Sequence, residues 1–384
     1  MLPKQQFYGE IIVTKEILIV AGETSADQHG AALVSQLKAA SKDVTFFGIG
    51  GDKLRRGGVQ LVEHAENMAF MGFVEVAKHY WFLRTVYNKV VSECEKRNPA
   101  RAILIDYPGF NLRLAKELKK REIPVTYYIS PQLWAWKEKR IEIIRECVDQ
   151  MLCIFPFEEQ WYHQRGVEAT YVGHPFLDGE PNFMERERFL DKHSLSTDTI
   201  VLALMPGSRQ QEVNRHLKTM ITTVELVKRD IGISAIVGKA PAVELPQEIG
   251  DKIHIETDTP EMVLKYASIG IVSSGTVSLQ SAIYGVPSVV IYKMNPLTWI
   301  IANKVTQVSY ASMTNLIAKE EVLPELLQNR ARPEKIADCL KKWLRSEDLR
   351  EQAVNRLSEV KRQLGGPGAS KKVARLILER LETD

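Results

Sequence analysis

The sequence has few cysteines and no long apolar run. Its four cysteines (Cys94, Cys147, Cys153 and Cys339) are scattered and form no C-x-x-C pair, which argues against a disulfide scaffold or a zinc ribbon. No uninterrupted apolar run reaches the roughly 18 residues that a spanning helix needs. The N-terminal residues include acids and no signal-peptide core, so we expect no export. These absences predict a cytosolic protein.

Several catalytic signatures are missing as well. The chain contains no H-E-x-x-H, no D-x-D triplet, no G-K-[ST] phosphate loop and no G-x-G-x-x-G fingerprint. We therefore expect no metal, no ATP hydrolysis and no nicotinamide cofactor. The net charge of 51 − 48 = +3 is too small to imply a nucleic-acid partner, although it suits an anionic membrane face.

The chain does contain two series of short aliphatic runs. With 384 residues, 45% hydrophobic and 26% charged, it has the length of two ordinary domains. Such runs, typical of strands buried on both faces, occupy 17–21, 44–48, 102–106, 125–129 and 151–155, then 201–205, 234–238, 269–273 and 288–292. Helical stretches are predicted between or after them at 27–40, 111–121, 134–147, 210–229 and 370–382. We predict an α/β protein with two doubly wound Rossmann-like domains facing a cleft, and a linker near 178–182.

Two motifs follow strands of the first half. Gly22 permits a tight turn before a helix that Ser25 or Asp27 could cap. Asp106 closes another strand two residues before Pro108, where a carboxylate could point into the ligand crevice and accept a proton. The alternative is that Asp106 or Asn111 caps the next helix, and the residues alone leave these interpretations about evenly balanced.

The second half has two candidate anion sites. One strand runs into Pro206-Gly207-Ser208-Arg209 and then a helix, and another runs into Ser274-Gly275-Thr276 and a second helix. A small-residue turn at a helix N-terminus presents free N–H groups, and an arginine adds a planar fork for phosphate oxygens. Together they favour a diphosphate site. The alternative for Arg209 is a solvated side chain in a first helical turn.

Residues 73–90 have an unusual pattern. A 3-4 spacing predicts a buried stripe that comprises Phe73, Val76, Tyr80, Leu83, Tyr87 and Val90. Val74, Trp81 and Phe82 fall off this stripe and share the other faces with cations. Exposed aromatics among cations favour a helix that dips into a bilayer surface. The alternative is a helix buried on two sides.

Taken in order, these motifs resemble the lipid-A-disaccharide synthase family of GT-B glycosyltransferases. The resemblance covers roughly residues 17–330 and is carried by GETSAD (22–27), MGFVEV (71–76), IDYPGFN (105–111), YISPQLWAWKEKR (128–140), FPFE (155–158), VGHP (172–175), MPGSRQQEV (205–213), SSGTVSLQ (273–280), MTNLIA (313–318) and PELLQ (324–328).

The resemblance implies a reaction. The family joins UDP-2,3-diacylglucosamine to 2,3-diacylglucosamine 1-phosphate (lipid X), and the products are lipid A disaccharide 1-phosphate and UDP. It would be an inverting displacement in lipopolysaccharide synthesis of a Gram-negative bacterium, without cofactor or metal. Asp106 stands where the family's proposed general base stands, Arg209 would neutralise the leaving diphosphate, and Asn315 matches a family active-site asparagine.

The resemblance also implies binding roles. The nucleotide would bind Gly207, Ser208, Arg209, Ser274, Gly275, Thr276 and Gln280. An acceptor loop would comprise Gly22, Glu23, Ser25 and Asp27, and membrane contact would fall to Phe73, Val74, Trp81 and Phe82.

The resemblance also implies a separate role for each of the two domains. Residues 1–178, with the C-terminal helix 368–384, would form an acceptor and membrane-facing domain, and 179–367 the UDP-sugar-binding domain. We expect a cytoplasmic protein at the cytosolic face of the inner membrane. The oligomeric state stays open, with a homodimer among the alternatives.

The sequence departs from the family pattern at several positions. Gln280 stands where a glutamate usually holds the ribose hydroxyls, and an amide can still accept one hydrogen bond and donate another. Ala26, Gly109 and Thr314 replace a Gly, an Asp and a Pro. Two other functions therefore stay open. One is a different GT-B UDP-sugar enzyme such as a UDP-N-acetylglucosamine 2-epimerase, and the other is a non-catalytic, membrane-associated nucleotide-sugar-binding protein.

Overall fold

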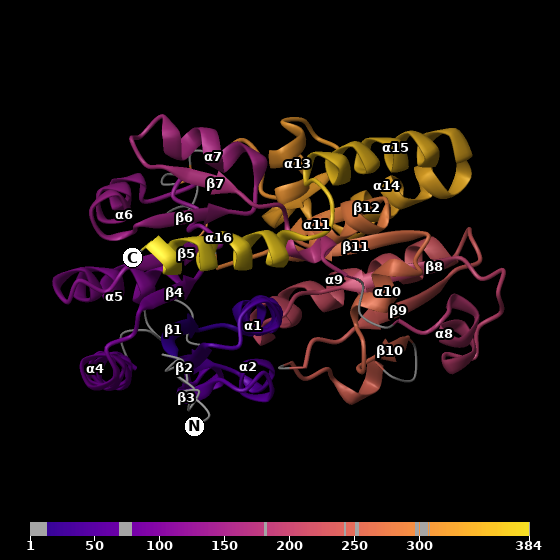
Figure 1. Ribbon diagram of the computed structural model, residues 1–384. Coiled ribbons are helices and arrows are strands. Elements are labelled where there is room, and N and C mark those ends of the chain that lie inside the picture. The colour runs from indigo at the N-terminus through magenta and orange to yellow at the C-terminus, as the bar shows by residue number, and fades with distance from the viewer. Residues whose placement is uncertain are drawn as a thin grey trace, which may run out of the picture. The chain divides into compact units, whose positions relative to one another are not determined.

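The computed structural model divides the chain into two compact units (Figure 1). It describes residues 14–68, 79–179, 183–241, 243–249, 253–295, 299, 306 and 308–383. Unit 1 comprises the chain up to Leu133, Lys137–Asp178 and the residues from Pro367 onward. Unit 2 comprises Trp134–Trp136 and Gly179–Gly366.

Unit 1 is built on a seven-stranded parallel sheet in the order β3-β2-β1-β4-β5-β6-β7. Its strands are β1 (Lys15–Ala21), β2 (Val44–Gly50), β3 (Gln60–His64), β4 (Arg101–Ile105), β5 (Val125–Tyr128), β6 (Gln150–Cys153) and β7 (Ala169–Tyr171). The central strands β1 and β4 are almost wholly buried, as their continuous aliphatic runs predict.

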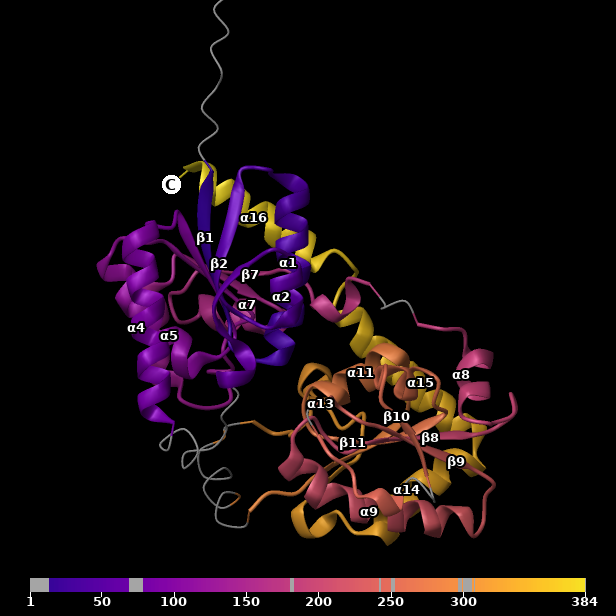
Figure 2. The same cartoon turned by 90° about the horizontal axis from the view of Figure 1, so that it is seen from below.

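Helices cover both faces of this sheet. Its helices are α1 (Thr24–Ala40), α2 (Asp52–Arg56), α4 (Tyr80–Arg97), α5 (Pro108–Lys120), α6 (Ile141–Cys147), α7 (Pro156–His163) and α16 (Ala369–Thr383), with 3₁₀ turns η1 (Ala65–Met68), η2 (Glu138–Arg140) and η3 (Pro175–Leu177). Figure 2 shows α4 and α5 on one side of the sheet and α1 with α16 on the other.

The last helix, α16, is anchored in unit 1 by Asp178. The Asp178 carboxylate accepts hydrogen bonds from the N–H groups of Gly368 (2.9 Å), Ala369 (2.6 Å) and Ser370 (2.6 Å). An acidic group that satisfies these free N–H groups is a strong helix cap. Asp178, the last residue of unit 1 before the chain enters unit 2, therefore fixes the start of the helix that returns to unit 1.

Unit 2 repeats the same plan with a six-stranded parallel sheet in the order β10-β9-β8-β11-β12-β13. Its strands are β8 (Val201–Met205), β9 (Ser234–Gly238), β10 (His254–Glu256), β11 (Ile269–Ser273), β12 (Ser288–Tyr292) and β13 (Glu325–Leu327). Its helices are α8 (Arg186–Lys192), α9 (Gln210–Lys228), α10 (Glu261–Lys265), α11 (Thr276–Tyr284), α13 (Met313–Ala318), α14 (Pro333–Arg345) and α15 (Glu347–Gln363), with turns η4 (Gln247–Ile249) and η5 (Gln328–Arg330). Helices α9 and α14 pack together on one face, and α11, α13 and α15 on the other.

The predicted α/β class with two doubly wound sheets is confirmed, while the helix predicted over 134–147 is partly wrong. Its first residues are not helical, and α6 begins only at Ile141 after the short turn η2. The lysine before η2, Lys137, has a φ of 58°, a left-handed backbone that interrupts a right-handed helix.

Candidate active site

The two motif loops of unit 1 leave the same edge of its sheet. Strands β1 and β4 are parallel neighbours, and the strand order reverses between them. Ligands of such sheets bind beyond the carboxyl ends of the strands at this switch point. The loops also touch, since a Cβ at Gly22 would lie 2.5 Å from the Tyr107 ring. Only glycine fits there, which explains its place in the first motif.

Asp106 is held in an unusual backbone conformation directly after β4. Asp106 and Tyr107 have φ angles of 46° and 48°, a left-handed region that costs non-glycine residues energy. Two buried side chains hold the bend: Asn111 Nδ2 and the Tyr127 hydroxyl each donate to the Asp106 carbonyl at 2.7 Å. Asn111 Nδ2 also lies 3.2 Å from the carbonyl of Ile105. The bend places the half-buried Asp106 side chain at the edge of the sheet.

The surroundings of Asp106 favour its protonated form. Burial, followed by the negative charge of Glu23, raises the pKa of Asp106 from 3.8 to about 7. A carboxyl group with a pKa near neutrality can both accept and release a proton under physiological conditions. Glu23 therefore lies close enough to Asp106 to influence its chemistry.

Asp27 caps a different helix from the one that the sequence predicts. Its buried carboxylate accepts hydrogen bonds from the N–H groups of Gly51 (2.7 Å), Lys53 (3.1 Å) and Leu54 (3.1 Å). It thus caps α2, not its own helix α1, and these three bonds leave it little remaining capacity to bind a ligand in the acceptor loop. Ser25 is exposed, so it stays available for that role.

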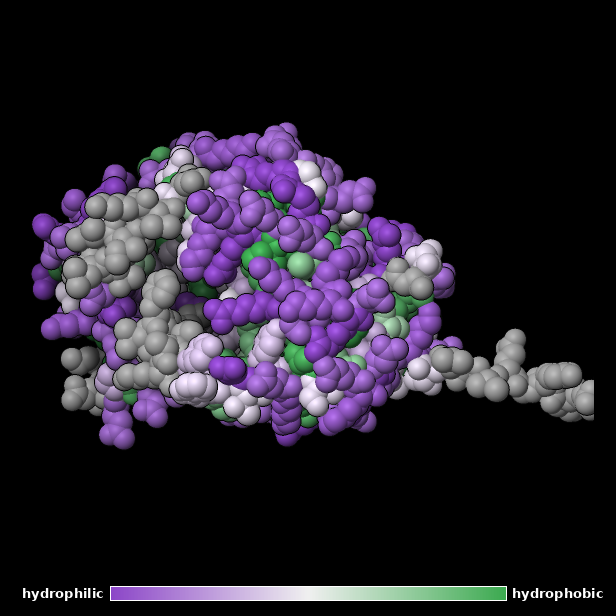
Figure 3. Space-filling model, turned by 90° about the vertical axis from the view of Figure 1, so that its left-hand side faces the viewer, coloured by the Kyte–Doolittle hydropathy of each residue, from purple (hydrophilic) through white to green (hydrophobic). Residues whose placement is uncertain are grey.

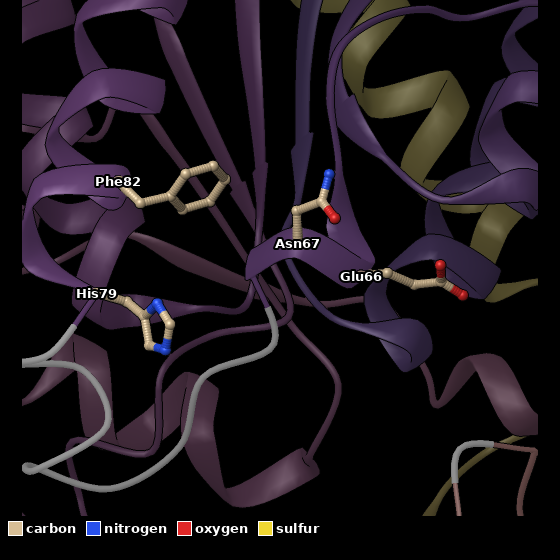
Figure 4. Close-up of a pocket in the computed structure, with 4 residues that line it drawn as sticks. All are labelled: Glu66, Asn67, His79 and Phe82. Carbon is tan, nitrogen blue, oxygen red and sulfur yellow. The ribbon is translucent and has the colours of Figure 1, made fainter.

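A pocket of about 420 Å³ opens beside the loop that contains Asp106 and Tyr107 (Figure 4). Glu66 and Asn67 of η1 line one side, and His79 and Phe82 at the start of α4 line the other. The Tyr107 hydroxyl donates to the Met68 carbonyl at 2.9 Å, which ties η1 to the Asp106 loop. The pocket offers a carboxylate, an amide, an imidazole and an aromatic ring, groups that suit the hydroxyls and ring of a sugar.

The predicted membrane helix is only partly described. Phe73 and Val74 lie outside the described residues, and α4 begins at Tyr80. Trp81 is 71% exposed, and the Arg84 guanidinium lies 5.7 Å from its ring centroid, a cation–π geometry. Phe82 is half-buried and packs on the core, which corrects its expected exposure.

Tyr80 needs the opposite correction. The 3-4 spacing predicts that Tyr80 belongs to the buried stripe, but this residue is 45% exposed. Figure 3 views unit 1 from the left of Figure 1 and shows a mostly hydrophilic face with small, scattered hydrophobic groups.

In unit 2 the two predicted anion sites follow neighbouring strands. Strands β8 and β11 are paired, and the order of the sheet reverses between them. Gly207 and Gly275 have φ angles of 127° and 128°, which L side chains rarely adopt. Helices α9 and α11 begin within three residues of these glycines, so both sets of N-terminal N–H groups belong to one edge of the sheet.

The polar residues of these two turns lie at the surface of unit 2. Ser208, Arg209 and Thr276 are exposed, and Ser274 and Gln280 are half-buried. Arg209 Nη1 pairs with the Glu212 carboxylate at 3.0 Å, and the same carboxylate fills the space where a Cβ at Gly207 would lie. The Arg209 side chain is therefore oriented by its own helix.

Asn315 does not reach the surface. It is fully buried, and its amide oxygen accepts from the N–H groups of Val322 and Leu323, both at 2.9 Å. Its Nδ2 donates to the Leu323 carbonyl and to Glu325 Oε1, both at 2.8 Å. Asn315 therefore acts on the chain around it in this structure and does not face a ligand, contrary to the catalytic role expected for it.

Sequence reasoning missed two side chains that support Asp106 or Asn315. Tyr127 lies inside an ordinary apolar strand and carries no signal of its own. Glu325 belongs to the motif PELLQ, to which the sequence alone assigns no role. Across the described ranges, no group of three or more His, Cys, Asp or Glu side chains is arranged to hold a metal ion. No helix among the described residues combines the length and apolar content needed to cross a bilayer.

Comparisons with known proteins agree with the motif pattern. The family model described as lipid-A-disaccharide synthetase matches residues 17–378. Similar curated proteins are the lipid-A-disaccharide synthases of Trichlorobacter lovleyi (37% identical; 96% of this chain and 98% of that protein covered), Myxococcus xanthus (37%; 95% and 97%) and Coxiella burnetii (34%; 94% and 98%).

Solved structures show the same fold at low identity. One is the UDP-GlcNAc 2-epimerase from Neisseria meningitidis bound to UDP-GlcNAc, at 11% identity with a TM-score of 0.64 and coverage of 95% and 100%. Another is the glycosyltransferase of kitacinnamycin, at 14% identity with a TM-score of 0.63 and coverage of 96% and 99%. At such identities the likeness shows the GT-B fold alone.

Proposed function

The chain belongs to the lipid-A-disaccharide synthase family and is a GT-B glycosyltransferase of lipid A synthesis, and from this premise we propose how it performs the transfer. We propose that UDP-2,3-diacylglucosamine donates its glucosamine to the 6-hydroxyl of 2,3-diacylglucosamine 1-phosphate. The observation that carries the proposal is Asp106, a carboxyl group with a pKa of about 7 at the switch point of unit 1.

Asp106 acts as the general base of this reaction. The acceptor hydroxyl attacks the anomeric carbon and passes its proton to Asp106, while the bond from that carbon to the UDP oxygen breaks on the opposite face. The configuration at the anomeric carbon is thereby inverted. A pKa near the working pH suits such a base, because the group is ionised when needed and still binds a proton well.

Unit 2 holds the leaving group. The negative charge on the diphosphate grows as the bond breaks, so N–H groups at the starts of α9 and α11 and the Arg209 guanidinium stabilise the transition state more than the ground state. Arg209 must exchange part of its pairing with Glu212 for phosphate oxygens. Gln280 of α11 bonds the ribose hydroxyls.

Unit 1 receives the acceptor and faces the membrane. The pocket between η1 and α4 lies beside the Asp106 loop and takes part of the acceptor. Trp81, exposed and next to Arg84, inserts into the headgroup region of an anionic bilayer. The protein then works in the cytoplasm, peripherally bound to the inner membrane.

The test is product formation by purified protein in mixed micelles with both lipid substrates and a chelator present. We expect a disaccharide phosphate with a β linkage and release of one UDP per linkage. An α-linked product would refute the inverting displacement. In a parallel reaction with UDP-N-acetylglucosamine alone, formation of its 2-epimer would instead assign the epimerase activity named in the structural comparison.

A further inference from the structure

Glu325 at the start of β13 is a buried carboxylate that binds four uncharged donors. Only 8% of the residue is exposed. Its Oε1 accepts from the N–H of Ser312 (2.9 Å), the Oγ of Ser312 (2.8 Å) and Nδ2 of Asn315 (2.8 Å), and its Oε2 accepts from the N–H of Ala311 (2.8 Å). A carboxylate removed from water is stable only when such donors replace its hydration. The segment 311–315 is therefore folded around Glu325.

This segment is attached on its other side to the turn before α11 and to α11 itself. The Ser274 hydroxyl donates to the Ala311 carbonyl at 2.7 Å, and the Thr314 hydroxyl donates to the Ser278 carbonyl at 2.6 Å. Ser274 and Ser278 lie on either side of Gly275 and Thr276, where the N-terminal N–H groups of α11 are presented. A continuous set of hydrogen bonds thus links the Glu325 carboxylate to the proposed diphosphate site.

We propose that Glu325 is a positioning residue for the nucleotide diphosphate. By holding 311–315, it fixes the turn at Ser274 and the first turn of α11, so that the N–H groups at the start of α11 point toward phosphate oxygens. Asn315 helps to position the diphosphate site through its hydrogen bond to the Glu325 carboxylate and does not touch the substrate. The proposal rests on the function given above, in which this end of unit 2 binds UDP.

Glu325→Gln is the sharpest test because it keeps the shape of the side chain. Whichever way the amide is turned, its NH₂ group faces an N–H donor where the carboxylate offered an oxygen. We expect UDP affinity, measured by calorimetry, to fall about tenfold or more, in line with the loss of a charged, buried hydrogen bond. The kinetic counterpart is a raised KM for the UDP-sugar with an unchanged KM for the acceptor.

Glu256→Gln is the matched control within the same unit. Glu256 is likewise buried, and its carboxylate forms five hydrogen bonds with four groups: two with Lys192 Nζ, one with His193 Nε2 and one each with the N–H groups of Asp258 and Thr259. It lies at the end of the edge strand β10. We expect it to lower the melting temperature comparably but to leave UDP affinity within twofold of the unmodified protein.

A second variant covers the case in which Glu325→Gln does not fold. Thr314→Val removes only the hydroxyl that bonds Ser278, and Thr314 is fully buried and cannot contact a ligand directly. Thr314→Val should weaken UDP binding about threefold or more. In the double variant with Glu325→Gln, the fold loss of UDP affinity should be smaller than the product of the fold losses of the two single variants, because both act through the same segment.

The outcomes separate this inference from the proposed function. Unchanged UDP affinity in Glu325→Gln, or in Thr314→Val where the former does not fold, overturns the positioning role while the glycosyltransferase assignment stands. An equal loss of affinity in Glu256→Gln also overturns it, because the effect would then be one of stability alone. Failure of the unmodified protein to bind UDP refutes the diphosphate site and this inference with it.

Discussion

Replacing Asp106 by Asn should inactivate the protein and stabilise it at the same time. Asparagine cannot accept the proton of the attacking hydroxyl, so we expect turnover to fall by at least about 10²-fold. UDP binding should be retained, because the proposed UDP site belongs to unit 2. Asn also suits the backbone at this position, since it tolerates the left-handed region (φ 46°) better than most residues.

The gain in stability follows from the pKa of Asp106. The pKa rises from 3.8 to about 7, about three units, and at about 1.36 kcal/mol per unit this corresponds to about 4 kcal/mol. The side chain is half-buried, so screening by solvent reduces the effect to about 2 kcal/mol. Between pH 4 and 7 the folded protein binds this proton more tightly than the unfolded chain, so its unfolding free energy falls as the pH rises. The Asn variant lacks this loss.

Thermal unfolding at pH 4.5 and pH 8 measures the difference. At pH 8 the melting temperature of Asp106→Asn should exceed that of the unmodified protein by roughly 4–8 °C, and at pH 4.5 the two should nearly coincide. Asp43→Asn, which removes one exposed carboxylate from the same unit, controls for net charge. A variant that is less stable at pH 8, or a difference that does not depend on pH, would refute the assignment of a buried, proton-binding carboxyl group.

Four further variants test other parts of the site. Glu23→Gln removes a charge that raises the pKa of Asp106, so the pH at which kcat/KM rises should move lower, and a shift upward would contradict the pairing. Asp27→Ala leaves three N–H groups at the start of α2 unsatisfied, those of Gly51, Lys53 and Leu54. It should lower the unfolding free energy in denaturant by about 2 kcal/mol and leave the KM for the acceptor unchanged. A raised KM would restore Asp27 to the acceptor loop. Trp81→Ser should weaken liposome binding without changing the melting temperature. Phe82→Ser should lower the melting temperature, because Phe82 packs on the core. A large loss of stability in Trp81→Ser would show that the Trp81 ring is structural.

The sequence predicted the central strands well and the edge strands poorly. Strands such as β1, β4, β8 and β11 are buried on both faces and read as unbroken aliphatic runs. Strands β7, β10 and β13 have three residues each, too few to establish a period, and none was predicted. Strand β3 was missed because it is only half-buried and mixes polar with apolar residues.

The candidate site shows the same division between local and distant contacts. The glycines at positive φ and the turns before α9 and α11 could be inferred, because a strand, a small-residue turn and a helix are adjacent in sequence. The partners of Asp27 could not, since its carboxylate caps a helix 24 or more residues away. Asn315 was misjudged for a related reason: its partner Glu325 lies on the next strand, and only the fold shows that their side chains meet.

The return of α16 to unit 1 has a consequence for synthesis on the ribosome. Unit 2 is, apart from three residues, one continuous run from Gly179 to Gly366, so it can fold as soon as that run has emerged. Unit 1 begins earlier but lacks α16, whose buried face includes Val373, Ile377 and Leu381, until Ala369–Thr383 has been made. The first half of the chain must therefore wait with part of one face of its sheet uncovered, the face that α16 shares with α1, while the second half folds. A chain truncated after Gly366 would leave unit 1 in that state. Chaperone dependence and aggregation on truncation should accordingly concentrate in the N-terminal half of the chain.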